Sequence, residues 1–172
     1  MTEPSTATVQ VHRIYIRATP QAIWDALTQP EWTRRYGYTG LAHVDQRPGG
    51  SYRLAPTPEL EEFGFSGDMA HGEVLVADAP RKLVMTWRLL MDPGLAAEPF
   101  TTITYDIEET KTAGVRLTVT HDLTGAPAHE ALVAGRFENI DAGPGESAGG
   151  GWAWILSDLK SVLETGDSIV AH

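Results

Sequence analysis

The sequence predicts an α+β domain in which a curved antiparallel sheet of six to seven strands wraps around one long C-terminal helix. Three observations lead to this fold class. A short helical pattern stands near the start at 19–28, alternating apolar and polar stretches fill the middle, and a glycine run leads into Trp152 and a helical pattern at the end. Alternation with a period of two is typical of strands, whereas apolar spacings of three and four are typical of helices.

Local signals near the start predict one strand followed by two short helices. Residues 9–17 are rich in β-branched and aromatic side chains, which favours a strand. Thr19 is a suitable N-cap, and Pro20 fits the first helical position after it. Pro30 ends this helix, because proline disfavours helical backbone in the residue before it. A second, shorter helix is expected over residues 31–36.

Six further strands are expected in the middle of the chain. They cover residues 41–47, 51–55, 69–77, 83–90, 102–107 and 115–122. Pro48, Gly49 and Gly50 form a turn signal between the first two, and we expect a loop or irregular hairpin at 56–67. Both faces of 83–90 are partly apolar, which indicates a central strand.

The C-terminal part combines an ambiguous stretch, a glycine run and a clear helix. Residues 125–142 fit no single pattern, although 128–137 could form a short helix. The run at 143–151 is flexible by composition, and it can be read either as a gate beside the helix or as a plain loop. Apolar residues at helical spacing from Trp152 onward predict a helix that ends near Gly166.

Length and composition are those of one domain with one core. The 172 residues suffice for a single core, which we place at residues 9–166, between a flexible N-terminus at 1–8 and a tail at 167–172. The net charge of −10 argues against nucleic acid and against an anionic membrane surface as partners. The absence of cysteine excludes disulfides and thiolate catalysis. We expect no secretory signal, no membrane-spanning helix and a cytoplasmic location.

Several motifs together resemble the Bet v 1/START-like (SRPBCC) superfamily, and more specifically its bacterial group named after the activator of Hsp90 ATPase. The motifs cover much of the chain from residue 9 to residue 165. They are Ala18-Thr19-Pro20 with Ile23 to Thr28, Pro48 to Tyr52, Gly72 to Leu75, Pro80 to Trp87, Leu117 to His121 and Gly151-Trp152. The resemblance implies the helix-grip fold, whose sheet encloses a pocket against the C-terminal helix. Residues 125–150 depart from it, being longer and richer in glycine.

The implied pocket would be mostly apolar, with a few polar groups that orient a ligand. We predict that aromatic and apolar side chains line it, although each of them could simply fill the core. The predicted lining residues are Trp32, Tyr36, Tyr52, Met69, His71, Met85, Trp87, Tyr105, His121, Trp152, Ile155, Leu156 and Leu159.

Three residues are candidates for acid–base chemistry. His121 lies on the apolar face of its strand, where it could act as a general base or stay buried and neutral. His71 and Glu73 share one face of an earlier strand and could converge with His121. Such a group could transfer protons or, less readily, bind a metal. Glu73 could instead pair with Arg88 or Arg116 across the sheet.

These features lead to a binding protein for a small hydrophobic molecule, such as a lipid, a polyketide or an aromatic metabolite. One alternative is an enzyme of the cyclase/aromatase type that acts on a polyketide-like substrate. A second alternative is an Hsp90-type co-chaperone. We expect no cofactor and no metal, and exposed edge strands leave a homodimer open.

Overall fold

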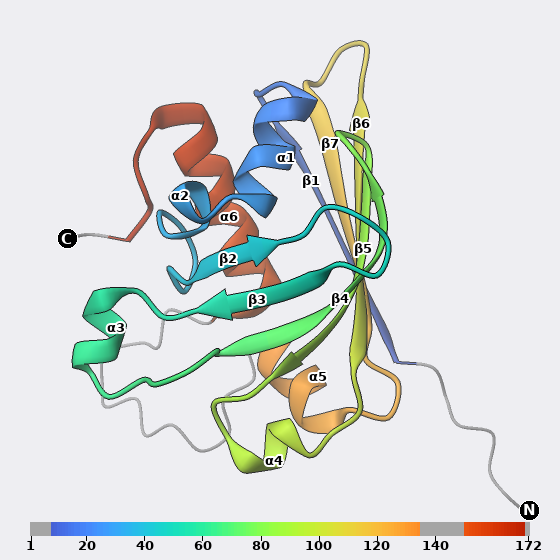
Figure 1. Ribbon diagram of the computed structural model, residues 1–172. Coiled ribbons are helices and arrows are strands. Elements are labelled where there is room, and N and C mark those ends of the chain that lie inside the picture. The colour runs from blue at the N-terminus through green and yellow to red at the C-terminus, as the bar shows by residue number, and fades with distance from the viewer. Residues whose placement is uncertain (1–7, 135–149, 171–172) are drawn as a thin grey trace, which may run out of the picture.

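A seven-stranded antiparallel sheet forms the body of the protein, and a long helix lies along its concave side (Figure 1). The computed structural model describes residues 8–134 and 150–170. The order of strands across the sheet is β1-β7-β6-β5-β4-β3-β2. The elements of this layer are β1 (Val9–Ile16), β2 (Leu41–Val44), β3 (Ser51–Ala55), β4 (Ala70–Asp78), β5 (Lys82–Leu89), β6 (Thr101–Glu109), β7 (Val115–Asp122) and the helix α6 (Gly151–Thr165). The predicted fold class is confirmed.

The described residues also form five short helices in the connections: α1 (Pro20–Thr28), α2 (Pro30–Thr33), α3 (Pro58–Glu62), α4 (Pro93–Ala96) and α5 (Pro127–Val133). The two helices after the first strand are as predicted. The expected loop at 56–67 instead contains α3, and α4 was not predicted. Both begin as α1 does, with a capping side chain followed by proline: Thr19, Thr57 and Asp92 each accept a hydrogen bond from a backbone N–H of the first turn.

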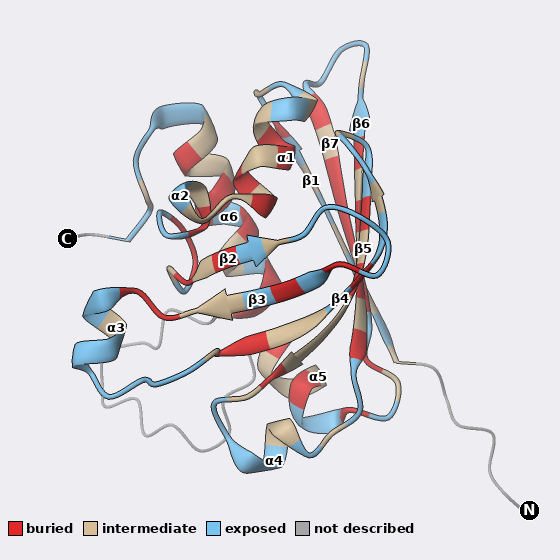
Figure 2. Cartoon of the chain, in the orientation of Figure 1, coloured by how far each residue is buried: buried red, intermediate tan, exposed pale blue. Residues whose placement is uncertain are grey.

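Alternation along the strands separates a buried inner face from an outer face (Figure 2). In β7, Val115, Leu117, Val119 and His121 are all buried. Buried side chains alternate in the same way along β5 and β6, which follow β7 in the sheet. One continuous core therefore forms beneath α1 and α6. In β4 the register shifts between Val74 and Val76, and a bulge of this kind bends a strand.

A buried carboxylate on α6 fixes that helix to two other parts of the chain. Asp158 has no exposed surface. Its Oδ2 accepts a hydrogen bond from the backbone N–H of Gly37 at 2.8 Å. Its Oδ1 accepts from the Ser168 hydroxyl at 2.7 Å and from the backbone N–H of Ile169 at 2.8 Å. The segment after α6 is therefore attached to the helix through Asp158.

We expect Asp158→Ala to lower the free energy of unfolding by about 3 kcal/mol, because one buried and two partly buried hydrogen bonds to this carboxylate are lost. Urea unfolding at neutral pH measures this change. Ser157→Ala is the matched control, since Ser157 is exposed and bonds only to Ala153 on its own helix. It should change stability by less than about 0.5 kcal/mol. Equal losses in the two variants would contradict this role of Asp158.

Candidate functional site

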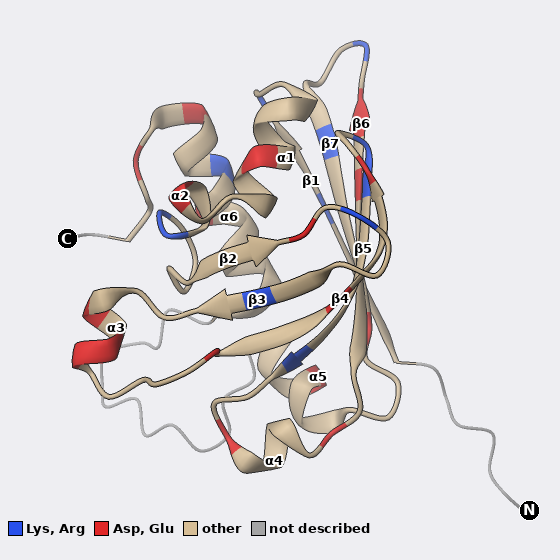
Figure 3. Cartoon of the chain, in the orientation of Figure 1, with Lys and Arg blue, Asp and Glu red and all other residues tan. Residues whose placement is uncertain are grey.

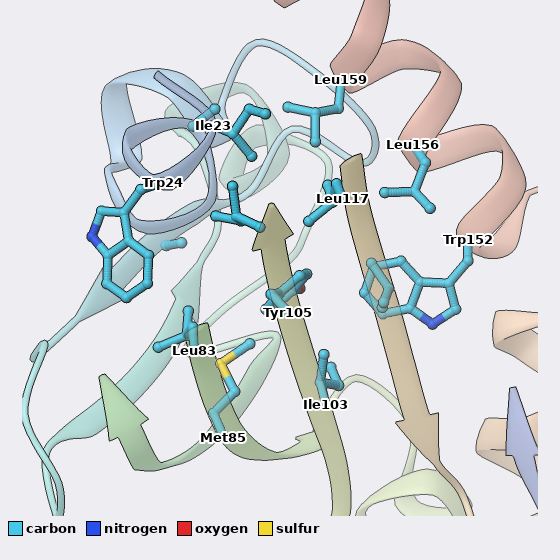
Figure 4. Packing of buried hydrophobic residues seen from close by; sticks show 14 of the residues in the cluster. Ile23, Trp24, Leu83, Met85, Ile103, Tyr105, Leu117, Trp152, Leu156 and Leu159 are labelled. Carbon is cyan, nitrogen blue, oxygen red and sulfur yellow. The ribbon is translucent and has the colours of Figure 1, made fainter. Parts of the chain in front are cut away.

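Most of the side chains predicted to line a pocket lie between the inner face of the sheet and the helices that cover it. In Figure 4, Trp152, Leu156 and Leu159 descend from α6 toward Tyr105 and Leu117 on the sheet. Nine of the thirteen predicted residues are buried, namely Tyr36, Tyr52, Met69, Met85, Tyr105, His121, Trp152, Leu156 and Leu159. Trp32, Trp87 and Ile155 are partly exposed and pack against the same core.

His121 sits at the centre of a hydrogen-bond chain that joins α6 to three strands. The indole N–H of Trp152 donates to His121 Nδ1 at 3.0 Å. An indole N–H can only donate, so Nδ1 carries no proton and the proton of the neutral ring lies on Nε2. His121 Nε2 lies 2.8 Å from the Thr101 hydroxyl, which in turn donates to the Trp87 carbonyl at 2.8 Å. Both ring nitrogens of His121 are therefore occupied.

The same surroundings keep His121 uncharged. Burial, with a smaller contribution from the nearby His129, lowers its pKa to about 3. The Trp87 and Trp152 rings meet the imidazole edge-on, with centroid distances of 5.4 Å and 5.8 Å. A ring that stays neutral and has no free nitrogen serves as a structural link. At neutral pH it offers no site for proton transfer.

Three tyrosines bring hydroxyl groups to the inner face. Burial raises the pKa of Tyr36 and raises that of Tyr52 to about 12, so both stay protonated. Tyr36 donates to the Ala26 carbonyl at 2.7 Å, and Tyr52 accepts a hydrogen bond from the indole of Trp87. Burial also raises the pKa of Tyr105, with Tyr52 and Tyr36 close enough to add to the effect. Among the described residues, the Tyr105 hydroxyl has no hydrogen-bond partner.

His71 and Glu73 lie on the other side of the sheet. Ala70 is buried on the inner face, and successive side chains of a strand point to opposite faces. His71 accordingly contacts Arg88 on the outer face, and Glu73 is exposed. Two strands, β5 and β6, separate β4 from His121 on β7. The predicted convergence of His71, Glu73 and His121 does not occur, and His71 does not line the inner face.

Glu73 also makes neither of the ion pairs that the sequence suggested. Arg116 pairs with Glu108 on the neighbouring strand, and Arg88 contacts His71. In the described ranges, no three His, Asp or Glu side chains are grouped so that they could hold a metal ion. Nor does that part of the chain contain a helix long and apolar enough to cross a membrane.

A second buried histidine, His129, was not singled out from the sequence, and the Trp87 ring contacts both it and His121. His129 on α5 accepts a hydrogen bond at Nε2 from the backbone N–H of Leu89 at 3.0 Å. Its Nδ1 therefore carries the proton and donates to Glu98 at 2.6 Å. Burial acts to raise the pKa of Glu98, but hydrogen bonds from His129 and from the backbone of Ala128 outweigh it, so the net pKa is lowered. This pair fixes α5 against the end of β5.

Two measurable hollows lie outside this face. One, of about 550 Å³, lies between the start of α1, the turn after β4 and the end of β6. The other, of about 290 Å³, lies between Leu123 and the start of α5. Neither is lined by a predicted pocket residue.

This arrangement of curved sheet, short helices and closing helix has counterparts among known proteins. Residues 17–164 match the family described as Activator of Hsp90 ATPase homolog 1-like protein. The chain belongs to this family. The match confirms the resemblance found in the motifs. No curated protein matches the chain by sequence.

Solved structures similar to this family member share its fold at low sequence identity. A protein from Staphylococcus saprophyticus is 18% identical, with a TM-score of 0.60 over 96% of this chain and 98% of its own. The Aha1 dimer from Colwellia psychrerythraea is 20% identical, with a TM-score of 0.57 over 92% of this chain and 98% of its own. CalU16 from Micromonospora echinospora is 22% identical, with a TM-score of 0.53 over 71% of this chain and 64% of its own.

The neutral state of His121 gives this family member a specific dependence on pH. The unfolded chain takes up a proton on this residue below about pH 6.5, whereas the folded chain does so only near pH 3. Folding is therefore opposed increasingly as the pH falls through this window, by up to about 1.4 kcal/mol per unit. We expect the stability advantage of the wild type over His121→Gln to shrink by about 2 kcal/mol between pH 6.5 and pH 4.5.

Urea unfolding at several pH values in this range checks this prediction. Val119→Ala is the control, because it weakens the same strand without removing a titratable group. Its stability deficit should stay constant over the range. If the stability deficit of His121→Gln is also independent of pH, the imidazole titrates in the folded protein as it does in the unfolded chain.

The tyrosine hydroxyls should differ in what they contribute to stability. Tyr36→Phe removes a buried hydrogen bond to Ala26, so we expect a loss of about 1–2 kcal/mol. Tyr105→Phe removes a hydroxyl without a partner among the described residues, so stability should stay unchanged or rise slightly. Thermal and urea unfolding of the two variants compare them directly. A loss at Tyr105 as large as that at Tyr36 would mean that its hydroxyl is already satisfied in the free protein.

Proposed function

We propose that this protein binds a small, uncharged and largely apolar molecule between the inner face of the sheet and α6. The Tyr105 hydroxyl would orient the ligand. The observation that carries the proposal is that the Tyr105 ring is buried in the hydrophobic core, while its hydroxyl has no hydrogen-bond partner among the described residues. A carbonyl or hydroxyl oxygen of a ligand could accept a hydrogen bond from this hydroxyl.

The distribution of the remaining accessible surface supports this position. Tyr36, Tyr105 and Trp152 each keep 8% of their surface, whereas Leu117 and Val119 beside them keep none. The accessible surface that remains at these positions therefore belongs to aromatic rings and phenol groups. Such a surface favours a flat or cyclic ligand with one or two oxygen atoms over a long acyl chain.

The geometry gives less support to an enzyme. The sequence offered His71, Glu73 and His121 as acid–base groups for a cyclase or aromatase reaction. His121 is neutral with both nitrogens occupied, and the other two lie on the outer face. An enzymatic function would need other residues. The description of the family names an Hsp90 activator, so an Hsp90-directed function stays the second alternative, to be tested by stimulation of Hsp90 ATPase activity.

The test begins with native mass spectrometry of the purified protein and identification of any molecule that stays bound. A panel of flavones, aromatic polyketides and medium-chain alcohols is then titrated against the wild type and against Tyr105→Phe. We expect at least one aromatic compound to bind, and its Kd to rise about fivefold to tenfold in Tyr105→Phe, because one hydrogen bond is lost.

Tyr15→Phe is the matched control. Tyr15 is exposed on β1, so this variant removes the same atom away from the inner face and should bind as the wild type does. A clean apo mass together with no binding across the panel would contradict the proposal. Binding that is equal in wild type and Tyr105→Phe would leave a ligand but remove this tyrosine from its recognition.

A further inference from the structure

Basic and aromatic side chains form a continuous row across the outer face of the sheet. His43 on β2 lies directly opposite Arg53 on β3, Arg53 lies opposite His71 on β4, and His71 lies opposite Arg88 on β5. The Phe100 ring follows, 5.2 Å from the His71 ring. We call these five residues the outer row. Three strand spacings separate His43 from Arg88, which is about 14 Å.

The cation at one end of the outer row is incompletely satisfied. Arg88 stacks on Phe100, with its guanidinium carbon 4.1 Å from the ring centre. Its Nη2 lies 3.1 Å from His71, and its Nη1 donates to the Glu98 carbonyl at the long distance of 3.5 Å. Its Nε is buried and has no hydrogen-bond partner among the described residues. No carboxylate in the described part of the chain pairs with this partly buried guanidinium, although a buried cation is normally paired.

The outer row stands out against the charge of the whole protein. The chain carries 23 acidic and 13 basic side chains other than histidine, which gives it a net charge of −10. Asp68 pairs with Arg53 at 2.9 Å. In the described part of the chain, no helix covers β3 and β4 on this side (Figures 1 and 3). Histidines and arginines placed directly opposite one another repel when both are charged, which an anionic partner would relieve.

A complementary surface lies on α3 of the same chain. Glu59, Glu62 and Phe63 are spaced three and four residues apart, so they share one side of this short helix. All three are exposed, and Phe63 keeps 85% of its surface. We call them the α3 tip. A phenylalanine exposed to this extent beside two carboxylates is suited to a surface that offers a stacking ring and the Arg88 guanidinium, which has no carboxylate partner among the described residues.

We propose that two copies of this chain associate through these surfaces, with the α3 tip of each copy on the outer row of the other. The carboxylates would face Arg53 and Arg88, and Phe63 would pack against Phe100. Because α3 joins β3 to β4, the tip and the row belong to the same end of the molecule. One two-fold axis can therefore form both contacts at once, as an isologous dimer requires. This inference does not depend on the ligand proposed above.

The test is the oligomeric state of the purified full chain, measured by sedimentation velocity from 5 to 200 µM at 150 mM salt. We expect a concentration-dependent dimer. Phe63→Ser, Arg88→Glu and Glu62→Arg should each raise the dissociation constant at least tenfold. The double variant Arg88→Glu with Glu62→Arg should recover most of the loss, because opposite charges face each other again with the signs exchanged.

Lys111→Glu is the control for net charge, since Lys111 is exposed in the turn between β6 and β7 and belongs to neither surface. It should dimerise as the wild type does. Phe63→Ser should still fold, because a side chain this exposed contributes little to the core, so its effect on dimerisation cannot be ascribed to misfolding. A wild type that stays monomeric at 200 µM would overturn the proposal. So would a dimer that tolerates all three single variants, or one that the double variant does not restore.

Discussion

The hydrogen bond from Trp152 to His121 is the contact on which the arrangement of this protein depends. It joins the closing helix to the centre of the sheet, and Thr101 extends it to the backbone of β5. Since an indole N–H can only donate, it also selects one tautomer of the imidazole. A single donor thus sets the position of the helix, the proton of the histidine and the direction of the hydroxyl beyond it.

In the described ranges, the interior that results is aromatic and polar in a few places, and Asp158 is enclosed by donors. Protonated phenols and the neutral imidazole of His121 provide its polar groups beneath α6. They can direct a ligand by hydrogen bonds, yet none of them is poised to exchange protons. The charges that remain free to act lie on the outer surface, where the row on the sheet and α3 offer opposite signs. The proposed ligand site and the proposed dimer surface would therefore use different chemistry.

Much of the fold could be predicted from the sequence, because alternation in the strands and apolar spacing in α6 are local patterns. The helices α3 and α4 were missed, although Thr57-Pro58 and Asp92-Pro93 repeat the cap and proline that had identified α1 at Thr19-Pro20. The site was harder to predict. Which strands are neighbours decides whether His71 can reach His121, and no local pattern reveals that two strands separate them. The pairing of His129 with Glu98 likewise depends on α5, whose position follows only from the folded chain.

Asp158 shows how one buried carboxylate can join three separate parts of the chain. Two of its three donors are main-chain N–H groups, at Gly37 and Ile169. Ile169 can therefore be replaced without loss of its hydrogen bond, whereas Gly37 has a φ of +60°, which disfavours any residue with a Cβ. The folding unit also reaches past the last turn of α6. A chain cut after Gly166 would keep the whole helix and still lose two of the three bonds that hold its buried charge.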